Sequence, residues 1–209
     1  MTKEENAIIR DKLRPETLIP PDYINMYCYC ASLAIDKPGD IIEIGVYKGG
    51  SLFRLAEYLQ DSQAVAMATK RLIGIDTFEG HPYDDPDEPD HPKGRFGDAS
   101  YDAVKNALAI FPFVDVRKGI GSDVFSTFSA NHQFCLAHID VDIKKSAIDT
   151  LNYIYPRVSL GGIIIFDEYK GYGQESYITD FFADKPVNSI QRPEGHGHGG
   201  YGLIVQKMG

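Results

Sequence analysis

Four carboxylates stand where two apolar runs of the sequence end. Asp140 and Asp142 close the run "CLAHIDVD", and Asp167 and Glu168 close the run "IIIFDE". Carboxylates gathered in one place repel one another, and their pKa values shift strongly unless a cation lies among them. An all-oxygen ligand set of this kind suits Mg²⁺, Mn²⁺ or Ca²⁺ better than zinc. The alternative is that the four side chains cap the N-termini of the helices that follow.

Short apolar strands that alternate with helical patterns would bring these carboxylates together. The strands are predicted at residues 40–45, 71–76, 114–119, 134–140 and 163–168. This alternation is typical of βαβ units and predicts a doubly wound, mostly parallel Rossmann-like α/β sheet with helices on both faces. Neighbouring parallel strands end at one edge of a sheet. Asp140 and Asp167 are 27 residues apart, the length of one helical crossover, so both are expected at that edge.

Two further segments complete the expected domain plan. Residues 1–36 are predicted to form a helical segment packed on the core, and residues 37–209 are predicted to form the ligand-binding domain. At its end, residues 187–193 and 201–207 alternate in hydrophobicity, which predicts an antiparallel pair that closes the sheet. In this arrangement the strand at 187–193 runs parallel to the others and the last strand returns.

One polar segment, residues 79–98, follows the second predicted strand. It contains seven carboxylates and four prolines and is too polar to form a core. One interpretation is a solvated insertion. The other is a lid or substrate-specificity loop, because in a parallel sheet this loop emerges on the ligand side.

Composition narrows the choice of partners and compartment. The net charge of −9 argues against a nonspecific grip on nucleic acid. The three cysteines, an odd number, argue against a disulfide framework and favour a reducing compartment. The charged N-terminus is not a signal sequence, and no apolar stretch is long enough to cross a bilayer. We therefore expect a soluble cytoplasmic protein that binds neither nucleic acid nor membrane; a homo-oligomer remains compatible with the sequence.

The segment "EIGVYKGGS" is a glycine-containing turn between a strand and a helix. Gly45 permits a sharp turn, Gly49 permits close approach, and Ser51 offers a hydroxyl and an N–H near the helix start. Tyr47 occupies the position where a dinucleotide fingerprint has its second glycine, so a cofactor without a pyrophosphate fits better. Glu43 would suit a cationic group such as an α-amino group. A tight β–α turn with no ligand is the structural alternative.

Asp76 ends the second predicted strand, 31 residues after Gly45. An acidic side chain at this position can accept hydrogen bonds from two ribose hydroxyls. Together with the glycine turn it predicts a purine-nucleoside cofactor, either NAD or S-adenosylmethionine. A helix cap or turn residue is the alternative for Asp76 alone.

Three segments carry a resemblance to a known family. "GDIIEIGVYKGGS", "IGIDTFEGHP" and "AHIDVDIKKSAIDTLNYIYPRVSLGGIIIFDEY" together resemble the macrocin and mycinamicin sugar O-methyltransferases, over roughly residues 39–183. These are class I S-adenosylmethionine enzymes that need a divalent metal. The resemblance implies that the glycine turn holds the methionine part of the cofactor, that Asp76 takes the ribose, and that Gly119 and Ser122 flank the adenine.

The same resemblance assigns the acidic strand ends. It maps the metal ligands to Asp140, Asp167 and Glu168, with Mg²⁺ as the expected ion, and implies a hydroxyl acceptor on a sugar, a polyol or a similar small metabolite. Asp140, Asp142 or a histidine can take the proton of that hydroxyl.

A histidine pair near the C-terminus offers a further base. His196 and His198 lie in "EGHGHGG", the predicted connection between the last two strands, which the expected topology places on the ligand edge. The alternative is a flexible glycine hairpin with incidental histidines.

Two rival functions remain at this point. An NAD-dependent oxidoreductase shares the fold, but hydride transfer needs no cluster of carboxylates and Tyr47 would crowd a pyrophosphate. A nucleotide-binding module without chemistry also shares the fold. Four convergent carboxylates argue against it, because an idle site has no reason to tolerate their repulsion.

Overall fold

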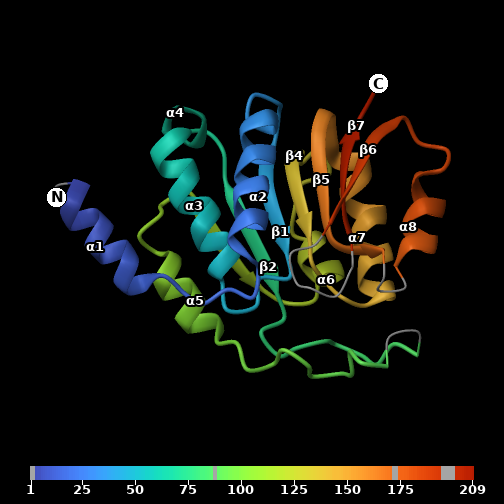
Figure 1. Ribbon diagram of the computed structural model, residues 1–209, viewed down its shortest axis with the longest axis horizontal. Helices are drawn as coiled ribbons and strands as arrows, with labels where there is room; N and C mark the ends of the chain where they lie inside the picture. Colours follow the sequence, from blue (N-terminus) through green and yellow to red (C-terminus); the bar gives the residue numbers. More distant parts are fainter. Residues whose placement is uncertain (1–2, 87–88, 171–173, 194–200) are drawn as a thin grey trace.

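The fold is built around one mixed β-sheet. The computed structural model describes residues 3–86, 89–170, 174–193 and 201–209. Within these residues the sheet has the strand order β3-β2-β1-β4-β5-β7-β6 (Figure 1). The strands are β1 (Asp40–Ile44), β2 (Leu72–Asp76), β3 (Val114–Lys118), β4 (Phe134–Ile139), β5 (Val158–Lys170), β6 (Val187–Pro193) and β7 (Tyr201–Lys207).

Strand pairing confirms the predicted topology. Strands β1 to β5 pair in parallel, and β7 is antiparallel to both β5 and β6. Strands β4 and β5 are direct neighbours, with Ile139 opposite Phe166. Asp140 and Asp167 each follow one residue after that pair, so the register itself brings the two carboxylates to the same point of the sheet edge.

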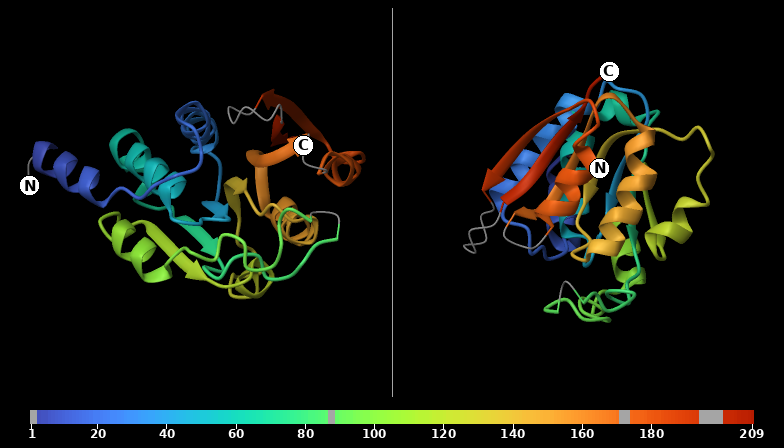
Figure 2. Two further views of the ribbon diagram at one scale, coloured as in Figure 1. Left: turned by 60° about the horizontal axis from the view of Figure 1, so that its bottom comes forward. Right: turned by 90° about the vertical axis from the view of Figure 1, so that its right-hand side faces the viewer.

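Helices cover both faces of the sheet (Figure 2). Helices α2, α3 and α5 bury apolar side chains against one face, and α6, α7 and α8 cover the other. Both faces of the inner strands β1, β2 and β4 are therefore buried, which explains their continuous apolar runs. The helices are α1 (Lys3–Leu13), α2 (Pro21–Ala34), α3 (Gly50–Ser62), α4 (Ala64–Met67), α5 (Tyr101–Leu108), α6 (Gly121–Phe125), α7 (Lys144–Arg157) and α8 (Glu175–Phe182).

The two N-terminal helices attach differently. Helix α2 buries Tyr23 and Tyr27 completely in the core. Helix α1 projects from the edge of the molecule (Figure 1). An ion pair between Arg10 and Asp61 of α3, at 2.8 Å, connects it to the rest of the fold. No helix in the described part of the chain has the length and apolar character that a bilayer span requires.

The fifth strand is longer than the predicted range 163–168. Strand β5 begins at Val158, although "SLGG" suggested a loop up to residue 162. This extension is stable because Val158 and Ser159 are buried and the Ser159 hydroxyl donates to the carbonyl of Pro38 at 2.7 Å.

Candidate active site

A cavity of about 790 Å³ opens at the carboxyl ends of the parallel strands. Its volume lies in the range of small-molecule sites, roughly 300–1,000 Å³. The cavity brings together most of the residues that the sequence singled out. Its lining includes Gly45, Tyr47, Ser51, Asp76, Gly119, Ser122, Asp140, Asp142 and Asp167.

The glycine turn joins β1 to α3 along one side of this cavity. Gly45 has a φ of 90°, and a Cβ atom there would lie 1.6 Å from the carbonyl oxygen of Asp140. Only glycine therefore fits between the ends of β1 and β4. Gly49, with a φ of 86°, precedes the first residue of α3 and is not among the residues that line the cavity. Tyr47 adopts a positive φ of 49° without being glycine, a conformation that costs free energy and is often found at functional sites.

Asp76 holds the glycine turn in place. Its Oδ2 accepts hydrogen bonds from the N–H groups of Val46 at 2.8 Å and Tyr47 at 2.7 Å. Its Oδ1 accepts from the N–H of Phe78 at 2.7 Å. A carboxylate has about four acceptor positions, so Oδ1 keeps capacity for a ligand hydroxyl. The turn-residue interpretation is therefore correct for Asp76, and it leaves the ribose role open.

Glu43 lies beneath the cavity and does not line it. Its side chain is fully buried, and its Oε1 accepts a hydrogen bond of 2.6 Å from the Ser51 hydroxyl. His138 Nδ1 lies 3.6 Å from Glu43 Oε2, and His138 Nε2 is 2.7 Å from the Tyr23 hydroxyl. Burial, with Glu43 nearby, raises the pKa of Tyr27 well above its usual value. In this structure Glu43 therefore positions Ser51 at the start of α3.

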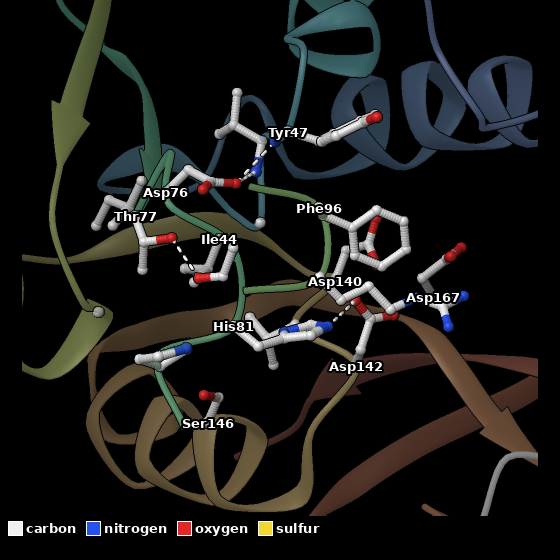
Figure 3. A pocket seen from close by; sticks show the side chains of 18 of the residues that line it. Ile44, Tyr47, Asp76, Thr77, His81, Phe96, Asp140, Asp142, Ser146 and Asp167 are labelled. Atoms are coloured by element: carbon white, nitrogen blue, oxygen red, sulfur yellow. Dashed lines mark hydrogen bonds and ion pairs between the residues drawn. The ribbon is translucent and has the colours of Figure 1, made fainter. Parts of the chain in front are cut away.

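The acidic edge forms the opposite side of the cavity. Figure 3 shows Asp140, Asp142 and Asp167 gathered there, next to Phe96. Asp167 is only 8% exposed, and its Oδ1 is buried without a hydrogen-bond partner among the described residues. An ionised oxygen in this position needs a positive partner. The donor set of Asp140 and Asp167 therefore fits a hard divalent cation.

Three predicted site residues cannot be placed with their side chains. Glu168 belongs to β5 by its backbone, but its side chain lies outside the described part. His196 and His198 fall in residues 194–200, which are outside the described residues. Their roles as third metal ligand and as base remain predictions.

The described parts of the polar segment, residues 79–86 and 89–98, lie over the cavity. Figures 1 and 2 show them running below the carboxyl ends of the strands. Phe96 is half-buried and its ring contacts that of Tyr47 in the glycine turn, with centroids 5.4 Å apart. On the other side, the Tyr83 hydroxyl lies 3.0 Å from that of Ser146 on α7. These contacts favour the lid interpretation over a solvated insertion.

Sequence reasoning missed two histidines in this segment. His81 and His91 line the cavity and both face Asp142, at 3.4 Å and 3.7 Å. The two rings stack with centroids 5.6 Å apart. The repeated His-Pro pair in an otherwise acidic stretch could have drawn attention to both histidines. A loop without periodicity, however, gives no basis for predicting which of its side chains come together.

Topology and site together define a class I methyltransferase architecture, with the ligand cavity at the carboxyl ends of a mostly parallel sheet. The family model described as macrocin-O-methyltransferase (TylF) matches residues 27–193. The chain belongs to this family.

Known proteins agree with this assignment. A curated relative, the 8-demethyl-8-(2,3-dimethoxy-alpha-L-rhamnosyl)-tetracenomycin-C 4'-O-methyltransferase of Streptomyces olivaceus, is 28% identical over 158 residues, covering 68% of this chain and 58% of that relative. This chain spans 53–65% of the length of the curated relatives it matches.

Solved structures show the same fold. The O-methyltransferase NovP superposes with a TM-score of 0.76 at 20% identity, covering 92% of this chain and 82% of that chain. An O-methyltransferase from Bacillus cereus in complex with SAH superposes with a TM-score of 0.63 at 16% identity, covering 98% and 90%.

Proposed function

We propose that this protein is an S-adenosylmethionine-dependent O-methyltransferase that acts on a hydroxyl group of a sugar or a similar small polyol or natural product. The observation that carries the proposal is the convergence of the glycine turn, Asp76 and the acidic edge in one cavity. The family supports the reaction type, and the sugar in the name of the Streptomyces olivaceus relative supports the acceptor class. Residues 37–209 carry the catalytic domain in this proposal, and residues 1–36 cover it.

The cofactor would lie along the glycine turn. Gly45 lets the turn lie against the end of β4 beside the methionine part, and Ser51, held by Glu43, presents its N–H at the start of α3. Asp76 Oδ1 accepts a ribose hydroxyl, and Gly119 and Ser122 border the adenine. Tyr47 is compatible with this cofactor, which has no pyrophosphate to bring against the turn. The Bacillus cereus neighbour with bound SAH supports this choice over NAD.

Asp140, Asp167 and Glu168 would hold a divalent cation, with Mg²⁺ as the expected ion. Such an ion would lower the pKa of a bound acceptor hydroxyl and orient its oxygen. The buried, unpartnered Oδ1 of Asp167 supports this assignment.

The chain's own groups then complete the transfer. Methyl transfer from a sulfonium to oxygen is an in-line displacement, so the main task of the protein is to align the two reactants. Asp140 or Asp142 accepts the proton of the acceptor hydroxyl, with His196 and His198 as alternative bases. Loop 79–98 excludes water from the cavity while Phe96 closes it against Tyr47.

Replacing Asp167 by Asn tests the proposal. The change keeps the shape but removes the charge that holds the cation, so turnover should fall at least roughly 100-fold. Affinity for S-adenosylhomocysteine should change less than about threefold, because Asp167 lies at the opposite side of the cavity from Asp76.

Two measurements check this: transfer of labelled methyl groups to a panel of glycosides and sugar nucleotides with Mg²⁺ or chelator, and calorimetry with S-adenosylhomocysteine. Asp115→Asn is the matched control, because Asp115 lies on the edge strand β3 and does not line the cavity. Full turnover in excess chelator would rule out the cation.

A further inference from the structure

The lid carries a second cluster of potential ligands, separate from the pair Asp140 and Asp167. His81, His91 and Asp142 each offer one ligand atom, and these atoms all lie within 4.8 Å of one another. Two of the three come from loop 79–98, and the third lies just beyond β4. Two nitrogens and one carboxylate oxygen suit zinc and other late first-row metals, whereas the all-oxygen edge suits Mg²⁺.

The distances match this chemistry. Two ligand atoms bound to one tetrahedral zinc ion at about 2.0–2.1 Å lie roughly 3.4 Å apart. His81 Nε2 lies 3.4 Å from Asp142 Oδ2, and His91 Nδ1 lies 3.7 Å from Asp142 Oδ1. Both separations are longer than a good hydrogen bond and need little change to hold a metal between them.

Burial leaves the facing nitrogens without other partners. His81 is 8% exposed and His91 15% exposed, and neither His81 Nε2 nor His91 Nδ1 has a hydrogen-bond partner among the described residues. Two imidazole nitrogens that face one carboxylate without forming a hydrogen bond leave a place for a metal ion among the three groups.

We propose that His81, His91 and Asp142 bind one transition-metal ion of the zinc type, which fastens loop 79–98 over the cavity. The ion joins two loop side chains to the end of β4, and its open coordination positions face the cavity, where water or an acceptor oxygen completes the shell. In this arrangement the metal holds the lid closed, and the Asp140 and Asp167 edge keeps its own hard cation.

Metal titration of the complete, chelator-stripped protein tests the site. Co²⁺ should bind at one equivalent with the intense d–d absorption of a low-coordinate nitrogen-containing site, and one equivalent of Zn²⁺ should displace it even in excess Mg²⁺. His81→Ala and His91→Ala should each weaken Zn²⁺ binding at least about 10-fold, since even outer-sphere partners act on that scale. His132→Ala, whose ring pairs with Asp40 away from the cavity, should bind like the unmodified protein.

Protease protection of the unmodified protein supplies a second readout. Lys93 and Arg95 are exposed in the loop, so Zn²⁺ should slow tryptic cleavage after them and leave cleavage after exposed Lys12 unchanged. Thermal unfolding in chelator shows whether the histidine variants are folded. Unaltered Zn²⁺ affinity in folded His81→Ala/His91→Ala protein, or no protection of the loop in unmodified protein, would overturn the proposal.

Discussion

Gly45 shows how one residue can set the geometry of the whole site. Its missing side chain lets β1 and β4 meet where the glycine turn and the acidic edge come together. The sequence predicted that Gly45, Asp76, Asp140 and Asp167 lie together at one edge of the sheet, and all four line the cavity there, because each stands at a strand end where the direction of the chain is predictable. Glu43 was expected to meet a cationic ligand group, but it is fully buried beside Tyr27 of α2, a contact that the sequence does not reveal.

Gly45→Ala should destabilise the fold by about 3 kcal/mol or more. The new Cβ would collide with the Asp140 carbonyl in addition to straining the positive φ. Gly94→Ala is a suitable control. Gly94 has a similar φ of 83°, but a Cβ there would meet nothing within 4 Å, so only the strain of about 1–2 kcal/mol remains. Urea unfolding monitored by circular dichroism measures both. Equal losses in the two variants would show that the β1–β4 contact is not tight.

Among the secondary-structure elements, the sheet was predicted correctly, whereas the path and contacts of loop 79–98 were not predicted. The strands were readable because apolar residues buried on both faces leave a continuous signal, as in β4. Loop 79–98 has no periodicity, so its path over the cavity depends on contacts between residues distant in sequence. Phe96 provides such a contact to Tyr47, and within the loop its ring also packs near His81 and His91.

Phe96→Ala should therefore loosen the loop without unfolding the sheet. Removing a half-buried ring costs roughly 1–2 kcal/mol here, which raises the open population about 5–30-fold. Amides that close the loop, such as Gly94 N–H bound to the His81 carbonyl at 3.0 Å, should exchange correspondingly faster.

Hydrogen exchange followed by mass spectrometry measures this effect. Phe128→Ala removes a half-buried ring that packs on His132 and Phe134, away from the loop, and should leave loop exchange unchanged. Identical loop exchange in Phe96→Ala and unmodified protein would mean that Phe96 does not hold the lid.

At the scale of the whole molecule, the strand order explains where the site lies. The order reverses direction between β1 and β4, the switch point at which open α/β sheets bind ligands. The glycine turn follows β1 and the acidic edge follows β4 and β5, so the proposed cofactor and acceptor sites would meet across that point. This placement was predictable once the strands were identified. The lid histidines were not, because nothing in a strand pattern constrains them.

Calorimetric titration with S-adenosylhomocysteine and with NAD tests the central claim most directly, because both ligands would enter the same cavity. The account predicts one equivalent of S-adenosylhomocysteine bound per chain and no heat with NAD. Asp76→Asn should weaken that binding by about 1–3 kcal/mol, since an amide offers one acceptor oxygen where the carboxylate offers two. Binding of NAD in place of S-adenosylhomocysteine, or undiminished affinity in folded Asp76→Asn protein, would contradict it.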